Sequence, residues 1–442
     1  MRRLALELAL AAERTPQQFA NFQRHIPVEL ILQALAETGA ATIRRRRLPA
    51  QQVVWLIIGI AMMRDLSIVQ VVDRLELALP GRKPVAPSAV AQARKRLGKA
   101  PLEWLFVTLA DAWGHQSARE HAWRGLGVYG VDGSSLRVAD SEENRRHFGG
   151  TDGHRGPSGY PLVRMVTLMV LRSHLLAAVQ FGPYQTAENQ YATELWPSVP
   201  PNSLVIVDKG FFGANILVPL TTNDRHFLIR AKRNTKWRVI EKLGRHDLIV
   251  EMDVSGYARS REETLERTWR ARAIRYQRKG FRPSMLLTSL LDPVAYPADE
   301  IVALYHERWE LELGYGEIKT DMLESRESIR SKSPERVEQE LLGVFLAYNL
   351  IRLEMAQIAG QAGVPPTRIS FVATLEMMTA EWFFMANMTA GAIPARLRSL
   401  EAKLARLLLP ERRSERSYPR AVKIKMSNYD RKRPSPTRRR AK

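Results

Sequence analysis

The chain has 442 residues, which is long enough for two or three domains with a sizeable core. It carries 67 Lys and Arg against 46 Asp and Glu, and this net charge of +21 favours a polyanionic partner, either nucleic acid or an anionic membrane surface. It has no cysteine, which excludes disulfides and thiolate zinc sites and fits a reducing compartment such as the cytoplasm.

Apolar segments near the N-terminus would be the sign of a membrane partner. The first is interrupted by Glu7 and is followed by no small-residue cleavage pattern, so it does not have the form of a signal peptide. The longest, Val53 to Met63, is too short to span a bilayer and predicts a buried helix. We therefore expect no membrane partner and favour nucleic acid.

Residues 1–120 have the periodicity of helices. Apolar residues recur at helix spacing in Pro27 to Thr38, another helix is predicted at Ile68 to Leu77, and a further one opens at Ser88, its expected N-cap. Basic residues cluster at Arg44 to Arg47. We predict an all-helical DNA-binding domain of helix-turn-helix character. A helical bundle with a basic surface fits the same pattern, and no recognition helix stands out.

The chain then changes to the pattern of strands. Leu126 to Val131 is a β-prone run that ends at Asp132 and the expected turn Gly133-Ser134-Ser135. Leu204 to Val207 is a shorter apolar run that ends at Asp208. A carboxylate directly after a buried strand lies at the edge of the sheet, where metal and substrate can reach it. Either Asp alone is more often a turn residue, but two such residues followed by a helical Glu indicate a site.

Further strands are predicted on both sides of Asp208. Two apolar runs, Leu162 to Leu171 and Leu175 to Phe181, have the character of a strand pair inside a sheet, and Phe227 to Arg230 predicts another strand. Residues 231–296 alternate apolar and basic segments. They predict a small β-rich subdomain inserted into the sheet domain.

The stretch Ala298 to Lys319 predicts one helix with a row of polar side chains. At about 100° per residue, four of them fall within an arc of roughly 60° on one face: Tyr305, Arg308, Glu312 and Lys319. Two cations and a hydroxyl suit phosphate oxygens, and one carboxylate suits a metal ion. A solvated helix face with i,i+4 pairs such as Arg308 to Glu312 is the alternative.

Three other glutamates of this helix compete for the role of third acid: Glu307, Glu310 and Glu317. They point roughly 140° to 160° away from Glu312, and only Glu312 stands four residues after Arg308 and seven before Lys319. We therefore expect Glu317→Gln to have only a mild effect on cleavage. Trp309, beside the polar face, is expected to pack in the core. Gly314 and Gly316 weaken the helix by about 1 kcal/mol each, and they either admit DNA or bend the helix.

The C-terminal part begins with a long helix predicted at Arg336 to Ile358, followed by a helical pair within 366–410. The tail, residues 411–442, carries 13 Lys and Arg against three Asp and Glu. We expect it to be disordered when free and to contact the DNA backbone. A solvated tail without function is the alternative.

Taken in order, the elements are strand–Asp132, strand–Asp208 and helix–Glu312, the last within the spacing Y-x2-R-x3-E-x6-K. This pattern resembles bacterial DDE transposases of the insertion-sequence-four family, whose signature is that Tyr-Arg-Glu-Lys spacing. Segments similar to the family include IPVELILQAL, GVDGSSLRVADSEEN, SLVIVDKGFF and YHERWELELGYGEIK. The resemblance covers most of the chain.

The resemblance implies an α/β fold with an RNase H-like catalytic core, a mixed sheet flanked by helices. That core is expected in residues 121–230 and 297–365, interrupted by the β-rich insertion at 231–296. The all-helical N-terminal domain, the C-terminal helices and the basic tail complete the chain.

The resemblance also implies the function and the site. Asp132, Asp208 and Glu312 become the catalytic triad and the metal ligands, and the other three signature residues become DNA contacts: Tyr305, Arg308 and Lys319. The chemistry agrees, since two divalent ions about 3.5–4 Å apart activate the attacking oxygen and neutralise the leaving oxygen of a phosphodiester. Oxygen-only ligands indicate Mg, with Mn as a substitute.

The expected activity is binding of the inverted terminal repeats of an insertion sequence, metal-dependent cleavage there, and strand transfer into target DNA. The partners implied are double-stranded DNA and a second copy of the chain, as a homodimer in the DNA complex, in the bacterial cytoplasm at the nucleoid. The alternatives are a catalytically inactive DNA-binding regulator and a hydrolytic nuclease without strand transfer.

Overall fold

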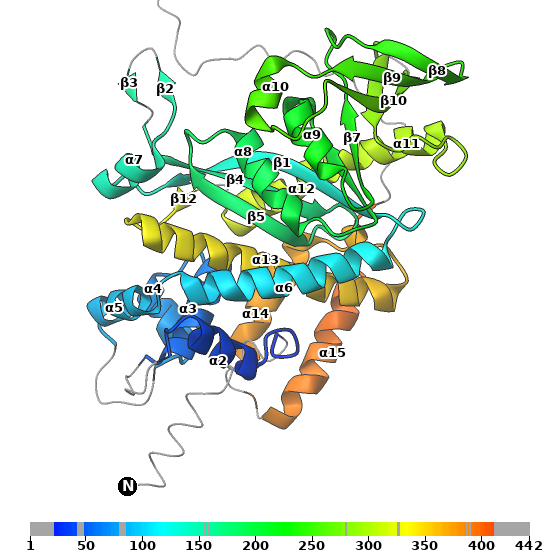
Figure 1. Ribbon diagram of the computed structural model, residues 1–442. Coiled ribbons are helices and arrows are strands. Elements are labelled where there is room, and N and C mark those ends of the chain that lie inside the picture. The colour runs from blue at the N-terminus through cyan, green and yellow to red at the C-terminus, as the bar shows by residue number, and fades with distance from the viewer. Residues whose placement is uncertain are drawn as a thin grey trace, which may run out of the picture.

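The computed structural model describes residues 22–41, 48–78, 85–153, 156–157, 159–278, 281–324, 328–385, 388 and 390–410. A twisted mixed sheet lies on a layer of helices, and further helices cover the other face of the sheet (Figure 1). The basic cluster at Arg44 to Arg47 and the tail at 411–442 lie outside the described residues, so their predictions stay untested.

Strand β1 (Gly127–Val138) is the centre of the sheet. On one side it pairs antiparallel with β4 (Leu162–Val170), which pairs antiparallel with β5 (Leu176–Pro183). On the other side it runs parallel to β6 (Ser203–Val207), and β6 runs parallel to β7 (Arg225–Arg230). The order β5-β4-β1-β6-β7 with these directions is that of an RNase H-like core. The predicted fold class is confirmed.

Alternate residues of these strands point to two separate cores, as the period of two in a strand requires. Val128, Leu204 and Ile206 belong to the core shared with α12 (Trp309–Gly316) and α13 (Pro334–Ala362). Val131 and Val207 belong to the core under the helices of the opposite face, α8 (Glu188–Leu195) and α9 (Ala214–Leu220). Burial on both faces explains why the central strands are nearly continuous apolar runs.

The strands of the insertion extend the main sheet and do not form a sheet of their own. β11 (Ser284–Thr288) pairs with β7, and β10 (Thr268–Tyr276), β9 (Asp247–Asp253) and β8 (Arg238–Gly244) follow outward. The β-rich insertion was predicted, but its pairing with the main sheet was not, because hydrophobic periodicity does not reveal which strands pair. Helix α10 (Gly256–Arg261) was also missed.

Strand β1 continues through the expected turn at Gly133-Ser134-Ser135, so that prediction was wrong. Asp132 pairs with Thr167, and every residue from there to the end of β1 has a partner in β4 or β12. Gly-Ser-Ser is typical of turns, but the long antiparallel neighbour β4 supplies the backbone partners that keep the chain extended. Only the parallel neighbour β6 stops, at Val207, which leaves residues 132–136 of β1 without a described partner strand on that side until β12 pairs with Arg137 and Val138.

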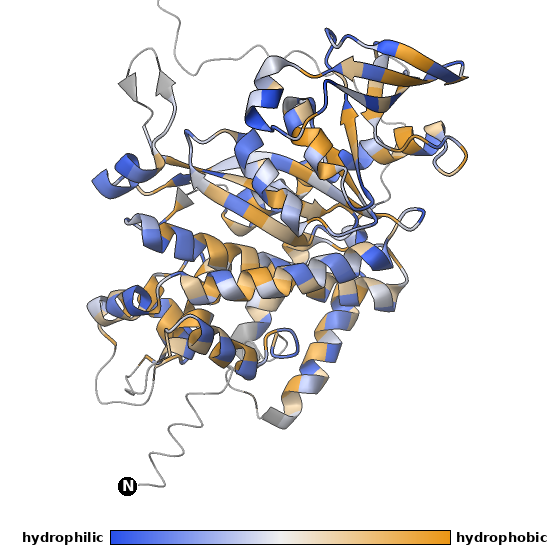
Figure 2. Ribbon diagram, viewed as in Figure 1, coloured by the Kyte–Doolittle hydropathy of each residue, from blue (hydrophilic) through white to orange (hydrophobic). Residues whose placement is uncertain are grey.

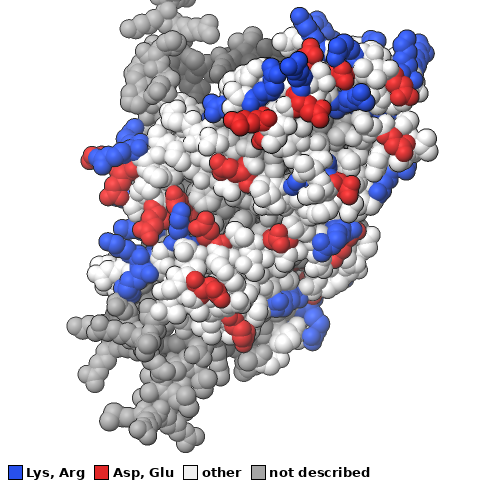
Figure 3. Space-filling view, in the orientation of Figure 1, with Lys and Arg blue, Asp and Glu red and all other residues white. Residues whose placement is uncertain are grey.

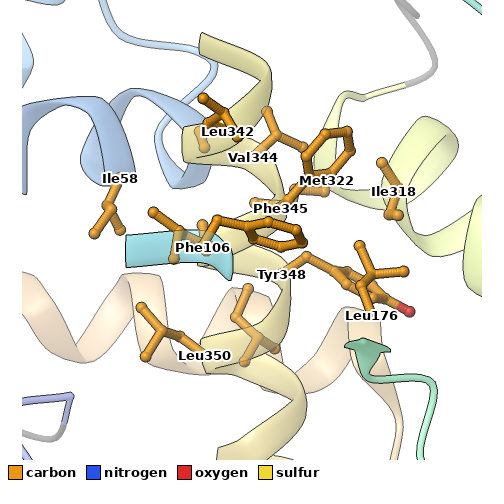
Figure 4. Packing of buried hydrophobic residues seen from close by; sticks show 14 of the residues in the cluster. Ile58, Phe106, Leu176, Ile318, Met322, Leu342, Val344, Phe345, Tyr348 and Leu350 are labelled. Carbon is orange, nitrogen blue, oxygen red and sulfur yellow. The ribbon is translucent and has the colours of Figure 1, made fainter. Parts of the chain in front are cut away.

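The N-terminal helices pack on one long helix, α13 (Pro334–Ala362), which confirms the helix predicted at Arg336 to Ile358. Their bounds are α2 (Val28–Glu37), α3 (Ala50–Met62), α4 (Ile68–Arg74), α5 (Pro87–Leu97) and α6 (Ala100–Glu120). In Figure 4, Phe345 of α13 lies among Ile58 of α3, Phe106 of α6 and Leu176 of β5. Figure 2 shows apolar residues concentrated where these helices meet.

Two details of α5 differ from expectation. The helix begins at Pro87 with Ala86 as its N-cap, so Ser88 is already inside the first turn. Arg94, in the last turn, is buried, and its Nε donates to Oε1 of Gln339 at 2.9 Å. This basic side chain therefore fastens α5 to α13, so not every Lys or Arg of the segment can serve a basic DNA-binding surface.

The remaining elements are short or C-terminal. They are α7 (Glu142–Phe148), β2 (Asp152–Gly153), β3 (Gly156–Pro157), β12 (Ser328–Ile329), α14 (Phe371–Met385) and α15 (Ile393–Leu404). The last two are the helical pair predicted within 366–410. By length and composition, α13 is the one helix in the described part of the chain that could cross a membrane, but its apolar window is 83% buried by other elements.

The crossing of α13 over α3 depends on Gly343. A Cβ at this position would lie 2.9 Å from the carbonyl oxygen of Ile57, a backbone atom that cannot move aside alone. We expect Gly343→Ala to lower the free energy of unfolding by about 1–3 kcal/mol, measured by urea denaturation. Gly360→Ala on the same helix is the control, because nothing lies within 4 Å there, and it should stabilise by up to about 1 kcal/mol. Equal effects of the two would contradict the close crossing.

Candidate active site

Two neighbouring parallel strands bring Asp132 and Asp208 side by side. Val131 of β1 pairs with Val207 of β6, so the next residue of each strand is one of the two aspartates, at a strand spacing of about 4.8 Å. The backbone N–H of Gly133 donates to Oδ1 of Asp132 at 2.8 Å, and that of Lys209 donates to Oδ1 of Asp208 at 2.7 Å. Both carboxylates are thus held at the open end of β6.

The third acid comes from a helical segment that changes its winding. α11 (Ala298–Tyr305) passes through a 3-10 turn (His306–Arg308) into α12 (Trp309–Gly316) and then into a π-helical stretch (Glu317–Met322). The expectation of one uniform α-helix was therefore wrong, and 100° per residue does not hold along it. The tighter and wider turns change the direction of each side chain without breaking the helical path.

Arg308 joins the helix to the strands. Its Nη2 donates to Oε1 of Glu312 at 3.0 Å, and its Nη1 lies 3.9 Å from Oδ2 of Asp132. Burial disfavours the charge of Arg308, but the surrounding oxygens raise its pKa above the ordinary value. The guanidinium therefore sits between two of the three predicted acids and neutralises them.

Tyr305 and Lys319 complete the set at the same end of the sheet. Tyr305 is 7% exposed, and burial raises its pKa to about 12, with the charge of Asp208 among the causes that raise it. The Nζ of Lys319 donates to Oγ of Ser134 in β1 at 3.5 Å. The structure thus brings all six predicted site residues to the part of β1 beside the end of β6, from positions up to 187 apart in the sequence.

The buried position of Asp132 shifts its titration. Burial raises the pKa of the Asp132 carboxyl to about 6, and the nearby charges of Asp208 and Glu188 act in the same direction. The Gly133 N–H and Arg308 oppose this shift. A carboxylate crowded by others and half buried is a group that a divalent cation would stabilise.

Tyr315 holds the backbone at the site, a role that the sequence analysis missed. Its hydroxyl donates to the carbonyl oxygen of Asp132 and lies 2.9 Å from Oγ1 of Thr167. Tyr315 stands three residues after Glu312, and residues three apart lie on neighbouring parts of one helix face. That spacing was the available signal.

The three competing glutamates are each paired elsewhere. Arg172 donates to both carboxylate oxygens of Glu307, at 3.0 and 2.9 Å. Nε2 of His174 lies 2.8 Å from Oε2 of Glu310. These partners come from the connection between β4 and β5.

Glu317 is the glutamate with the most buried partners, Arg352 and Tyr348. Arg352 of α13 donates to its carboxylate, and the Tyr348 hydroxyl donates to Oε2 at 2.8 Å. Burial alone would raise the pKa of Glu317, but Arg352, together with His174 and Tyr348, lowers it to about 2. Glu317 therefore contributes to the stability of the fold, a role that its spacing in the sequence does not reveal.

Two further residues of this segment differ from expectation. Trp309 is 45% exposed, so it is not the core residue that the sequence predicted. A Cβ on Gly314 would lie 2.5 Å from the Met169 methyl group of β4, whereas one on Gly316 would meet nothing within 4 Å. Gly314 therefore allows α12 to approach the sheet, which neither of the two earlier alternatives included.

The donor set fits a divalent cation, although the site is not preassembled. Within the described part of the chain, no three Asp, Glu or His side chains converge as a ready metal cluster. Arg308 lies between Asp132 and Glu312 and provides the positive charge there. Carboxylate oxygens alone, without sulfur or imidazole, are the donors that Mg²⁺ and Mn²⁺ prefer.

Comparison with known proteins decides the family. A model of the insertion element 4 transposase N-terminal domain matches residues 16–107, and a model of the transposase DDE domain matches residues 123–350. The chain is 38% identical over 429 residues to the transposase InsG for insertion sequence element IS4 from Escherichia coli (strain K12), covering 96% of each chain. The chain belongs to the insertion-sequence-four family of DDE transposases. The predicted family and enzyme class are confirmed.

Two other similarities were found. This transposase is 35% identical over 232 residues to the putative transposase InsZ of the same organism, covering 51% of the chain and 76% of InsZ. A solved structure of a piggyBac transposase synaptic complex with hairpin DNA has a TM-score of 0.41 and 12% identity, covering 90% of this chain and 86% of that one. That likeness is too distant to bear on the function. Membership of the DDE class implies dependence on divalent metal ions.

Asp132→Asn should stabilise the metal-free transposase at neutral pH. The folded pKa of about 6 lies above the ordinary 3.8, so the folded state binds the extra proton between these values, and stability falls as pH rises through that window. Asn removes the charge, so Asp132→Asn should have a higher free energy of unfolding than the unaltered chain above about pH 6. This difference should vanish below about pH 4. The measurement is urea unfolding with a chelator across this range.

The matched control for that experiment is Asp140→Asn. Hydrogen bonding to Arg145 lowers the pKa of the exposed Asp140, so its contribution to stability is present above its unfolded pKa and is lost as pH falls. Its replacement should give no gain at neutral pH. If Asp132→Asn raised the free energy of unfolding by the same amount at every pH, the stabilisation would not come from removing a buried carboxylate charge at residue 132.

Glu317→Gln should lower the free energy of unfolding by about 3–5 kcal/mol, because Arg352 would stay buried without its ionised partner. Glu307→Gln is the control. Its pair with Arg172 has side chains 31% and 30% exposed, so about 0–1 kcal/mol is expected. Urea denaturation of both variants measures the difference. If Glu317→Gln lowered the free energy of unfolding no more than Glu307→Gln, the buried pair of Glu317 and Arg352 would not stabilise the fold.

Proposed function

We propose that Asp132, Asp208 and Glu312 hold two Mg²⁺ ions in this DDE transposase, and that Mn²⁺ can replace them. The observation that carries the proposal is the pairing of Val131 with Val207, which makes the two aspartates neighbours at the open end of β6. Glu312 is tied to the same place through Arg308. When bound, the metal ions would make the attacking oxygen nucleophilic and neutralise the leaving oxygen.

The three other signature residues are proposed to hold the DNA end. Lys319 lies beside Ser134 on β1, two residues along the strand from Asp132, where an ammonium can meet a phosphate oxygen. Arg308 balances the carboxylates of Asp132 and Glu312, so its guanidinium becomes available to a phosphate once those carboxylates hold another cation. Tyr305 is buried near Arg308 and Asp208, and its hydroxyl is the proposed third group for the DNA end.

A basic surface at the outer edge of the same sheet supports the way in which DNA would be held. Figure 3 shows Lys and Arg gathered over α10 and the outer strands of the sheet. Exposed members of this surface are Arg238, Lys242, Arg245, Arg259, Arg261 and Arg270. Such a surface binds phosphates without reading sequence. We infer that it supports flanking or target DNA, and that the helices of residues 1–120 contact the terminal repeats.

Coupled cleavage at two element ends requires two active sites. We therefore infer a homodimer in the DNA complex, acting in the bacterial cytoplasm on nucleoid DNA. The absence of cysteine fits that compartment.

Asp208→Asn should abolish Mg²⁺-dependent cleavage of DNA that carries the ends of its own element, and Glu312→Gln should do the same. A loss of about 10³-fold or more is expected, because each carboxylate supports several kcal/mol of transition-state stabilisation. Gel mapping of nicked and joined products measures the activity, and mobility shift measures binding, which both variants should keep. Glu307→Gln is the control and should cleave normally.

Each outcome of this assay is decisive. Cleavage retained by Asp208→Asn would remove that residue from the triad. Nicks without joined products in the unaltered chain would favour a hydrolytic nuclease, and binding without any cleavage would favour an inactive regulator.

A further inference from the structure

Glu188, the first residue of α8, lies against the backbone next to Asp132. A Cβ built on Gly133 would come within 2.6 Å of the Glu188 carboxyl carbon and 2.9 Å of its Oε2. Any side chain at residue 133 would therefore displace this carboxylate. Gly133 gives Glu188 room beside the site, and the sequence analysis had assigned that glycine only to a turn.

Glu188 and Glu312 approach Asp132 from opposite faces of the sheet. Successive residues of a strand point to opposite faces. Position 130, on the face of Asp132, meets Leu311 of α12, whereas position 133 meets Glu188 of α8. β6 ends at Val207 and β12 pairs with β1 only at Arg137 and Val138, so no described strand pairs with residues 132–136 on that side, and the edge of β1 is open there to groups from either face.

The carboxylate of Glu188 is only loosely engaged within the protein. Its side chain is 45% exposed, and its ion pair with Arg164 has an N–O separation of 3.7 Å, longer than a hydrogen bond. Nη1 of Arg164 donates instead to the Thr186 carbonyl oxygen at 2.7 Å. The negative charge of Glu188 is felt at Asp132 and at Tyr315, the two residues bonded at the end of the site.

We propose that Glu188 is a fourth carboxylate of the metal site and binds a divalent cation jointly with Asp132. The proposal rests on the metal site described under Proposed function and adds a ligand that the Tyr-Arg-Glu-Lys spacing does not contain. A further anionic oxygen strengthens the hold on a hard cation, because affinity rises with the number and charge of the oxygen ligands. Gly133 is then a positioning residue, since it admits the carboxylate.

The test is a titration of the full chain with Mn²⁺, without DNA and without turnover. Electron paramagnetic resonance measures binding as the loss of the signal of free Mn²⁺. Glu188→Gln should weaken the affinity by about 10-fold or more. Gly133→Ala should weaken it in the same direction, because the added methyl group displaces the flexible end of Glu188. Glu194→Gln, an exposed glutamate of the same helix, is the matched control and should change nothing.

Asp132→Asn separates this inference from the one on which it rests. If Asp132→Asn weakens Mn²⁺ binding but Glu188→Gln matches the Glu194→Gln control, the fourth ligand is refuted and the three-acid site stands. If neither variant changes the affinity, both proposals fail. Weakening by both, with circular dichroism and unfolding unchanged in Glu188→Gln, supports the four-carboxylate site.

Discussion

The burial of helix α13 is the constraint on which the rest of the molecule depends. It lies between the N-terminal helices and the sheet and bonds to both. Gln339 accepts from Arg94 of α5, and the Asn349 side chain pairs with the N–H and carbonyl of Leu176 in β5, at 2.9 Å each. Arg352 then fixes Glu317 behind the candidate site. Polar groups buried this deeply are costly unless paired, so they specify how the layers fit together.

The site shows the opposite arrangement, with charges gathered and poorly satisfied. Asp132, Asp208 and Glu188 repel one another, and Arg308 offsets them only in part. Helix α13 and the paired sheet can tolerate this local penalty because their own groups are well paired. A site that is destabilised without cations is also one that gains most from binding them. The same gathering of carboxylates thus destabilises the cation-free protein locally and provides the ligands for the metal ions.

Much of this was visible in the sequence. The strands before Asp132 and Asp208, the long helix of the C-terminal part and the Tyr-Arg-Glu-Lys spacing are carried by local periodicity, which a sequence shows directly. What failed depended on partners far along the chain. β4 pairs with the part of β1 that was expected to be a turn, and β11 of the insertion pairs with β7 of the core. Arg352 forms a buried ion pair with Glu317, which makes Glu317 a structural residue. Glu188 was missed because only the fold brings it beside Gly133.

The place of α13 in the chain also sets when the site can exist during synthesis. All three candidate acids of the triad leave the ribosome before residue 334, the first residue of α13. A chain that ends earlier would contain every carboxylate but would lack both the helix under which α12 packs and the arginine that holds its last turn. The site can therefore form only late in synthesis, after α13 has been made. Incomplete products of translation would carry the carboxylates without the helix and the arginine that position them.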